Sequence, residues 1–536
     1  MAVDVDFVLP SGKRVSLPAF YCQDYSRRRL ADDTEAYDAR GRSQWRARFT
    51  PADAGRHTFQ VRVKDKFGGD YKGPEQSFDV AAAPFQGFVR VDRNDPEFLS
   101  FTNGGFFYPI GLIVRSPDDD RRQYDYEFDL VPGRGLAVYD EYFTSMSQHG
   151  LNFTRVWMGA WWTALEWSHG YRTDYPGLGQ YNQLNAWRLD YVVEQAENHG
   201  IYIDLTLHNH GQFRHREFDD EWYDNPYFKG QGGPVDYPDE FWTDETARSL
   251  LRKRLRYIVA RWSYSPAIAW WELCNEVDLI SNYDTAKVLS WHRAMAQYLK
   301  KIDPCRHVVS MHYTYSRLDP MIQALPENEI CQSTGYNADM VERLTGMYRD
   351  HHVFEKPVYL NEYGVGNSHN ELRHNLHAGL WASTVIPYCG AALFWWWPYV
   401  HVKNEYPQYG ALARFHAGED YRGKDYQRAQ LTPTWPVPGV EILAMQNIES
   451  ARLWIYDQRV YRTGTRRRLS APTVRTMDAS QWRLDNLTAG RYKVEFWDTW
   501  KGEVVSMREA QSSAGALLLD VPAFESDIAC KIDRVK

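Results

Sequence analysis

Two strand-like segments of the chain each carry an Asn-Glu pair, and their glutamates have the chemistry needed to cleave a glycosidic bond. Segment 270–276 ends in Asn275 and Glu276, and segment 359–364 contains Asn361 and Glu362. A glutamate at the tip of a buried strand lies where an apolar wall meets a cleft, and two such carboxyls can supply an acid and a nucleophile. The two glutamates are 86 positions apart, close to three strand–helix units of about 30 residues each.

Length and composition predict a large globular protein with several domains. The chain has 536 residues, of which 43% are hydrophobic and 15% aromatic, including 21 Trp. Single cores stop growing near about 250–300 residues, so more than one domain is expected. The net charge of −8 argues against nucleic acid and anionic membranes as partners, because binding to either needs a basic face.

The cysteines and the start of the chain help to predict the cellular compartment of the protein. The six cysteines are scattered without a Cys-x-x-Cys pair, so no disulfide framework is expected in a protein of this size. The sequence opens directly in a strand pattern with no charged-then-apolar leader, and no apolar run reaches membrane-spanning length. We therefore expect a cytoplasmic protein, or a secreted one if a leader has been removed.

Three regions differ in their pattern of polar and apolar residues. Residues 1–83 alternate with period two between Gly, Pro and Asp turns, which predicts an immunoglobulin-like β-sandwich. Residues 84–435 repeat a strand followed by a helix, which predicts parallel strands with crossover helices. Residues 436–536 return to the β pattern and are predicted to form a second β-sandwich.

The middle region contains enough strands for a closed barrel. Eight strand-like segments lie near 107–112, 153–158, 201–207, 268–274, 307–312, 330–333, 358–361 and 391–396. Helical stretches lie between most of them, such as 246–262, where apolar residues recur with the helical period. Eight such units predict a (β/α)8 TIM barrel, whose active site lies at the C-terminal ends of the strands. Glu276 then follows strand four and Glu362 ends strand seven, so the two face each other across the barrel mouth.

The two Asn-Glu segments resemble the strand-four and strand-seven signatures of clan A glycoside hydrolases, particularly family 5 and its relatives. The stretch 254–262 that leads into strand four is also similar to that group, and the flanking sandwiches resemble modules of its bacterial members. By this resemblance Glu276 is the general acid/base and Glu362 the nucleophile of a retaining mechanism. Such a mechanism requires the carboxyls to lie about 5–5.5 Å apart, with Glu276 protonated and Glu362 ionised.

The resemblance also implies roles for residues around this pair. Arg155, on strand two, matches the arginine that orients the nucleophile, and Asn275 matches the residue that binds the sugar 2-hydroxyl. Tyr336, after strand six, is placed to donate its hydroxyl to Glu362. His312, at the end of strand five, is in the position of a substrate-binding histidine or near the acid/base.

Each of these roles has a structural alternative. Two glutamates at strand ends can form a structural ion pair with Arg155, but two matching motifs at matching topology favour catalysis. Glu272 lies deeper on strand four and is interpreted as a buried ion-pair partner. Trp395 and Trp396 end strand eight, where the family places a tryptophan floor under the cleaved sugar, and Trp396 is preferred by a small margin.

His208 and His210, at the end of strand three, permit a metal interpretation. A His-x-His pair puts both side chains on one side of a strand, and imidazoles suit zinc. The family comparison instead places a sugar-contacting histidine here, so substrate binding is favoured, with His210 facing the cleft more than His208. No metal and no cofactor is expected.

The sequence therefore predicts a retaining glycoside hydrolase acting on an oligosaccharide, polysaccharide or other glycoside. A non-catalytic carbohydrate-binding barrel is the alternative, and a metal-dependent hydrolase is a more distant one. The sugar, the linkage and the oligomeric state are left open, because one fold serves many substrates.

Overall fold

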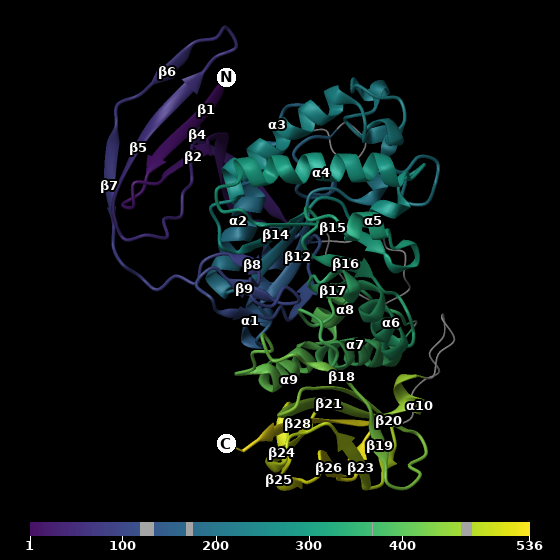
Figure 1. The fold of residues 1–536 in the computed structure, drawn as a ribbon. Helices are drawn as coiled ribbons and strands as arrows, with labels where there is room; N and C mark the ends of the chain where they lie inside the picture. Colours follow the sequence, from purple (N-terminus) through teal and green to yellow (C-terminus); the bar gives the residue numbers. More distant parts are fainter. Residues whose placement is uncertain (118–132, 168–174, 367, 463–473, 536) are drawn as a thin grey trace.

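Seven parallel strands form the centre of the molecule, which is a computed structural model describing residues 1–117, 133–167, 175–366, 368–462 and 474–535. Each strand is hydrogen-bonded to the next in sequence order. The strands are β11 (Gly111–Ile113), β12 (Phe153–Trp157), β13 (Tyr202–Thr206), β14 (Ile268–Glu272), β15 (Val308–Thr314), β16 (Cys331–Thr334) and β17 (Val358–Glu362). Helices alternate with them and surround the sheet (Figure 1), which confirms the predicted β/α barrel.

The first and last predicted strands differ from the expectation. Strand one begins at Gly111, because Phe106–Phe107 pairs instead with β9 (Leu99–Phe101) as strand β10. The predicted eighth strand is irregular and forms only isolated bridges, from Phe394 to Leu112 of β11 and to Tyr363 after β17. These bridges still close the ring. The chain then turns at once into helix α8 (Trp397–Val402), which prevents a longer ladder.

Local sequence signals start most of the helices around the barrel. They are α1 (Leu136–Gln148), α2 (Gln183–His199), α3 (Glu245–Trp262), α4 (Thr285–Ile302), α6 (Met340–His351) and α7 (His369–Thr384). In all but α1, an Asn, Asp or Ser precedes the helix and accepts a hydrogen bond from a backbone N–H of its first turn. Such caps satisfy donors that the helix cannot pair internally.

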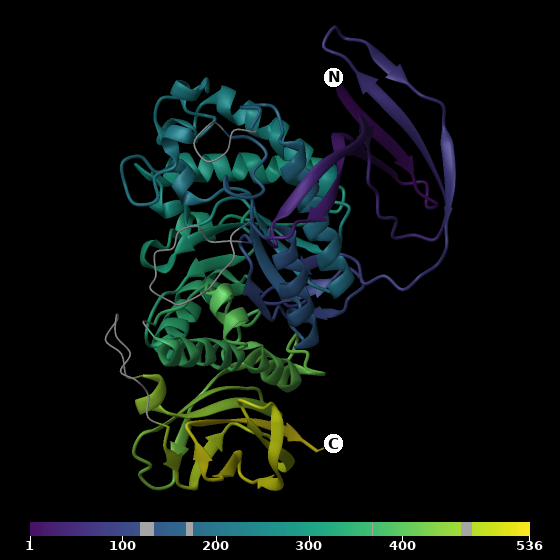
Figure 2. The ribbon, with the colours of Figure 1, turned by 180° about the vertical axis from the view of Figure 1, so that it is seen from behind.

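The N-terminal strands lie beside the barrel and reach it through a hairpin (Figures 1 and 2). Strands β1 (Ala2–Val8), β2 (Arg14–Pro18), β5 (Gly55–Lys64), β6 (Asp70–Lys72) and β7 (Gln76–Val80) form one antiparallel sheet. Strands β3 (Phe20–Arg29) and β4 (Glu35–Arg46) pair separately, and β3 packs against α2. The sheet and hairpin together are tied to the barrel by ion pairs such as that of Arg48 with Asp190, at 2.7 Å.

The hairpin supplies the cap that helix α1 lacks. Gly135 precedes α1 and offers no side chain, but Glu35 of β4 accepts hydrogen bonds from the backbone N–H groups of Leu136 (2.7 Å) and Ala137 (3.0 Å). A carboxylate at this position also interacts favourably with the helix dipole. The side chain of Glu35 is almost fully buried and forms an ion pair with Arg27.

Replacing Glu35 with alanine is therefore expected to lower the free energy of unfolding by about 1–2 kcal/mol, the usual cost of a lost helix cap. Denaturant titration followed by circular dichroism measures this change. Glu75→Ala, an exposed glutamate of the same N-terminal region, is the control and should stay within about 0.5 kcal/mol of the parent. Equal stability of the two variants would contradict a capping role for Glu35.

The C-terminal region is a second antiparallel β structure that lies next to helix α7 of the barrel, below it in Figure 1. A six-stranded sheet, β18-β20-β21-β28-β24-β25, faces a three-stranded sheet, β19-β23-β26, across a shared apolar core. Their bounds are β18 (Gln427–Ala429), β19 (Leu431–Pro433), β20 (Val440–Gln446), β21 (Ser450–Asp457), β23 (Ser480–Asp485), β24 (Gly490–Asp498), β25 (Glu503–Ser512), β26 (Ala516–Val521) and β28 (Asp527–Arg534). His377 of α7 joins the two parts: its Nε2 lies 2.9 Å from Asp527 and its ring stacks on Trp500.

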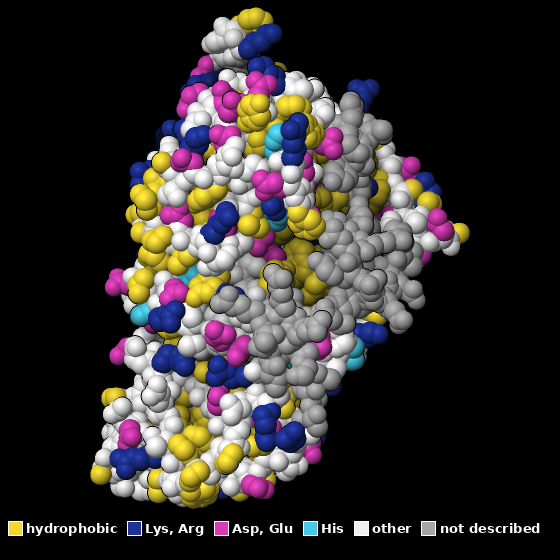
Figure 3. All heavy atoms as spheres, turned by 90° about the vertical axis from the view of Figure 1, so that its right-hand side faces the viewer, with side chains coloured by type: hydrophobic (Ala, Val, Ile, Leu, Met, Phe, Trp, Pro, Cys, Tyr) yellow, Lys and Arg dark blue, Asp and Glu magenta, His cyan; other side chains and the backbone are white. Residues whose placement is uncertain are grey.

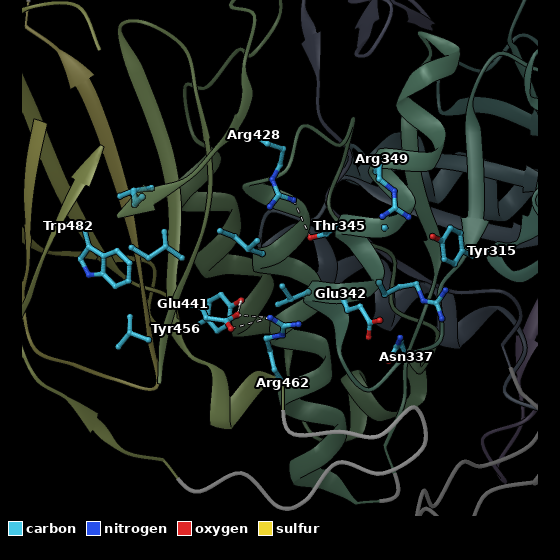
Figure 4. A pocket seen from close by; sticks show the side chains of 17 residues that line it. Tyr315, Asn337, Glu342, Thr345, Arg349, Arg428, Glu441, Tyr456, Arg462 and Trp482 are labelled. Carbon is cyan, nitrogen blue, oxygen red and sulfur yellow. Dashed lines mark hydrogen bonds and ion pairs between the residues drawn. The ribbon is translucent and has the colours of Figure 1, made fainter. Parts of the chain in front are cut away.

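A crevice of about 650 Å³ lies where α6 meets this C-terminal region (Figure 4). Polar contacts join the two sides of this crevice. Arg462 is ion-paired with both Asp339 (3.0 Å) and Glu441 (2.9 Å), and Arg428 donates to the Thr345 hydroxyl at 3.1 Å. The crevice therefore belongs to the interface in which these contacts hold the C-terminal sandwich against the barrel.

The described surface carries charges of both signs. Figure 3 shows acidic and basic side chains interspersed over one face of the molecule. No helix among the described residues is long and apolar enough to cross a bilayer.

Candidate active site

The side chains predicted to do chemistry come from five strands of the barrel. Arg155 lies on β12, Glu276 follows β14, His312 lies on β15, Tyr336 follows β16, and Glu362 ends β17. All except the partly exposed Tyr336 are buried. The carboxyl ends of parallel strands meet at one rim of a barrel, so these groups converge although they span more than two hundred residues of sequence.

Glu362 is held by three donors. Its Oε2 accepts a hydrogen bond from Arg155 Nη1 at 2.9 Å and lies 3.5 Å from Asn275 Nδ2. Its Oε1 accepts from the Tyr336 hydroxyl at 2.9 Å. Hydrogen bonds to the charged form favour a carboxylate over a carboxylic acid. The predicted contacts of Arg155 and Tyr336 with Glu362 are therefore present.

Glu272 fixes the orientation of the Arg155 side chain. The guanidinium donates from Nε (3.0 Å) and Nη2 (2.5 Å) to the two oxygens of Glu272, a bidentate pair that fixes its plane. This leaves Nη1 for Glu362. Glu272 is the buried ion-pair partner that its depth on the strand predicts.

Glu276 adopts a strained backbone conformation at the rim. Its φ of 41° and ψ of 51° lie in the left-handed region, which costs about 1–2 kcal/mol for a residue other than glycine. Its Oε1 accepts a hydrogen bond from the Thr334 hydroxyl at 2.7 Å. The strain turns the Glu276 side chain away from the line of the strand and toward Thr334 on β16.

His312 has a defined tautomer. Its Nδ1 lies 3.1 Å from the backbone N–H of Glu276 and 3.0 Å from Asn275 Nδ2, and both groups are donors. Nδ1 must therefore accept, which places the proton on Nε2, 3.3 Å from the Thr334 hydroxyl. Burial, reinforced by the charge of Arg155, holds the pKa of His312 well below its usual value, so this ring is neutral. A relay of donors then runs from His312 through Thr334 to Glu276.

His210 lies on the other side of Glu276. Its Nδ1 lies 3.0 Å from Asn275 Oδ1 and 3.5 Å from Glu276 Oε2, and its Nε2 lies 3.6 Å from Asp219. Burial alone would lower the pKa of His210, but Asp219, Glu276 and Asn275 together raise it. The amide of Asn275 is thus fixed between two histidines and points its Nδ2 toward Glu362.

His208 does not join this group. Its Nδ1 contacts the Leu273 carbonyl at 3.0 Å, its Nε2 meets Arg254 of α3, and its ring packs against Phe213 and Trp291. The two histidines diverge because β13 ends at Thr206, so strand alternation no longer governs them. The predicted substrate contact of His208 is not supported by this position. Among the described residues, no group of three or more His, Cys, Asp or Glu is arranged to hold a metal ion.

Each of the two predicted tryptophans contacts a residue close in sequence or space to Glu362 or Arg155. Trp396 donates from Nε1 to the carbonyl of Gly364 at 3.0 Å, two residues after Glu362. Trp395 packs against Trp157 with ring centroids 5.7 Å apart, and the Trp157 ring lies over the Arg155 guanidinium. The preference for Trp396 over Trp395 as the sugar floor remains a prediction.

The two catalytic candidates are electrostatically coupled. Burial, and then the charge of Glu276, raise the pKa of Glu362 to about 7, against the opposing effects of Arg155 and the Tyr336 hydroxyl. The geometry nevertheless favours a negative charge on Glu362, because its carboxyl has three donors, one of them charged.

Two contributors to the site were missed by sequence reasoning. Thr334 donates to Glu276, and Trp157 lies over Arg155. Trp157 stands two positions after Arg155 on β12, so strand alternation already placed it on the same face as that residue. Thr334 ends β16, two positions before Tyr336, where alternation no longer applies, and its contact with Glu276 is visible only in the tertiary structure.

Comparisons with known proteins agree with this geometry. Residues 133–399 match the sequence model of the family described as cellulase (glycosyl hydrolase family 5). The chain is 27% identical over 170 residues to mannan endo-1,4-beta-mannosidase 7 of Arabidopsis thaliana, an alignment that covers 30% of this chain and 37% of that protein. The chain spans about two-fifths of the length of the curated relatives it matches.

Solved structures share the fold along most of the chain. A Bacteroides vulgatus protein to which a glycoside hydrolase activity has been ascribed aligns with a TM-score of 0.62 and 14% identity, covering 100% of this chain and 95% of that one. A family 5 glycoside hydrolase from the same organism aligns with a TM-score of 0.52 and 12% identity, covering 84% and 93%. At these identities the likeness establishes the fold alone.

Proposed function

Since residues 133–399 are a glycosyl hydrolase family 5 domain, we propose that the protein is a retaining glycoside hydrolase with Glu362 as nucleophile and Glu276 as general acid/base. The observation that carries this proposal is the asymmetry of the pair. Glu362 is fixed by Arg155 and Tyr336, whereas the partners of the Glu276 carboxyl among the described residues are the hydroxyl of Thr334 and the imidazole of His210.

In the first step, a Glu362 oxygen attacks the anomeric carbon as the glycosidic C–O bond breaks. Glu276 gives its proton to the departing oxygen, which leaves as an alcohol. A covalent glycosyl ester on Glu362 results. Arg155 and Tyr336 keep the attacking carboxylate oriented before the bond forms, so less freedom is lost in the transition state.

In the second step, Glu276 is ionised and takes a proton from water, whose oxygen attacks the anomeric carbon. The ester bond to Glu362 breaks, and the carboxylate returns to the hydrogen bonds of Arg155 and Tyr336. Two inversions at the same carbon give retained configuration. Asn275, held between His210 and His312, is positioned to bind the sugar 2-hydroxyl.

We propose a β-1,4-linked mannan as the polysaccharide, because the curated relatives that match the barrel are named for that activity. A panel of aryl β-glycosides together with mannan, cellulose and xylan tests this assignment. Proton NMR of the first product should show the β-anomer before mutarotation, and mannan should be degraded fastest. Release of the α-anomer would overturn the retaining mechanism, and the absence of hydrolysis across the panel would favour a carbohydrate-binding barrel instead.

A further inference from the structure

Three carboxyl groups, one of them that of Glu362, surround a single guanidinium in the interior of the barrel. Asp204 of β13, Glu272 of β14 and Glu362 of β17 surround Arg155 of β12. Asp204, Glu272 and Arg155 are each 0% exposed, and Glu362 is 4% exposed. The proposed mechanism uses Glu362 and Arg155 and gives no role to Asp204.

Asp204 and Glu272 converge on the same donors. The Nδ2 of Asn361 lies 2.9 Å from Asp204 Oδ2 and 3.0 Å from Glu272 Oε2. The Nε of Arg155 also approaches both oxygens, at 3.8 Å from Asp204 and 3.0 Å from Glu272. Two carboxyl oxygens that share one amide group and one guanidinium are close neighbours. Gln332 of β16 holds Asp204 Oδ2 from a third direction at 3.1 Å.

The charges in this layer do not balance if every carboxyl is ionised. Three carboxylates around Arg155 would leave two uncompensated negative charges in a region closed to water, at a cost of several kcal/mol per ion. Among the described residues that hydrogen-bond or ion-pair with Asp204 or Glu272, Arg155 is the one cation, since Gln332 and Asn361 are neutral. The low pKa of His312 keeps its ring neutral, and His210, whose pKa is raised, acts on Glu362 and Glu276 at the rim. Cys274 of β14 also stays neutral, since burial raises the pKa of its thiol well above the usual value.

Like-charge pairs in such surroundings keep a proton. Burial, opposed mainly by Arg155, raises the pKa of Asp204 and raises that of Glu272 well above its usual value. The same two groups interact with each other, so their titration belongs to the pair.

We propose that Asp204 and Glu272 share one proton at neutral pH and, as a singly charged pair, position Arg155 for Glu362. The pair supplies one negative charge, which balances Arg155. The guanidinium then orients Glu362 through Nη1 without carrying an excess positive charge into the site. Asp204 and Glu272 are positioning residues, because they act on the reacting atoms only through Arg155.

Asp204→Asn separates this proposal from its rival, in which both carboxylates are ionised. In the variant, the amide N–H of the asparagine can donate to Glu272 in place of the proton that the two carboxyls share in the parent. The pair then still carries a single negative charge. We expect the pH profile of kcat/KM to be displaced by less than about 0.3 unit, whatever the change in its height. If both groups were ionised, the variant would remove a charge next to Arg155 and displace the profile by about one unit or more.

Two readouts do not depend on catalysis. The infrared spectrum of the parent at pH 7 should contain the carbonyl band of a protonated carboxylic acid that the Asp204→Asn spectrum lacks. Folding stability gives the second. With a raised pKa in the folded state, the pair keeps a proton that the unfolded chain releases above about pH 4, so the parent loses stability as pH rises. The Tm of Asp204→Asn minus that of the parent should therefore increase between pH 4 and pH 8.

A missing acid band, or a Tm difference that falls with rising pH, would overturn the proposal. Neither result would bear on whether Glu362 is the nucleophile, so failure here is distinguishable from failure of the proposed function. Glu272→Gln is the second variant, should Asp204→Asn not fold. It keeps the charge of the pair but weakens the bidentate contact with Arg155, so kcat should fall while the pH profile again stays in place.

Discussion

Glu362→Gln is expected to lower kcat/KM on an activated aryl glycoside by about 10⁴-fold or more, the scale of loss when a covalent nucleophile is removed. Glutamine is nearly isosteric and accepts hydrogen bonds from Arg155 and Tyr336 through its amide oxygen. It cannot form the glycosyl ester. Initial rates of phenol release measure the loss, and mass spectrometry should detect no glycosyl adduct on the variant.

The same change is expected to preserve or raise thermal stability at pH 7 to 8. The folded-state pKa of Glu362 is raised to about 7, so ionising this buried carboxyl weakens the folded state as pH rises from about 4.3 through 7. Glutamine cannot ionise and avoids that cost. Glu509→Gln, an exposed glutamate of the C-terminal sandwich, is the matched control and should keep full activity. Glu362→Gln with parental turnover would overturn the nucleophile assignment.

Glu276→Gln is expected to separate substrates by their leaving groups. Glycans whose leaving oxygen needs a proton should lose about 10²–10⁴-fold in kcat/KM, the usual contribution of a general acid. Aryl glycosides with acidic phenols need no such proton and should show a burst, because their glycosyl ester forms but lacks a base for hydrolysis. Azide, a nucleophile that needs no deprotonation, should restore turnover.

The pH dependence of Glu276→Gln should also change. In the parent, burial and the charge of Glu276 raise the pKa of Glu362 to about 7, so kcat/KM on activated aryl glycosides should rise as pH rises through 7. Without the charge of Glu276, Glu362 ionises at lower pH, and this rise should move to lower pH in the variant. Glu245→Gln, at an exposed site on α3, is the control. Equal losses on both substrate classes, with the rise left in place, would contradict the assignment of Glu276.

Much of the barrel could be predicted from local sequence. Apolar strand segments, the helical period of α3 and the capping residues of five helices are encoded within a few neighbouring positions, so they are readable without any tertiary contact. The predicted contacts of Glu362 with Arg155 and Tyr336 followed from the resemblance to clan A glycoside hydrolases, together with the placement of the strand ends on one rim. Strand eight was predicted less well, because isolated bridges to β11 and β17 leave no regular pattern in sequence.

Other features depended on which residues meet across the barrel. The cap of α1 by Glu35, the relay from His312 through Thr334 to Glu276, and the convergence of Asp204 on Glu272 each join strands far apart in the chain. The sequence by itself determined that two Asn-Glu strand ends face each other, because strand period and order suffice for that, whereas the place of Arg155 followed from the resemblance to clan A glycoside hydrolases. Only the tertiary structure decided how strongly each carboxyl is stabilised as an anion, because burial and the number of nearby donors exist only once the barrel has closed.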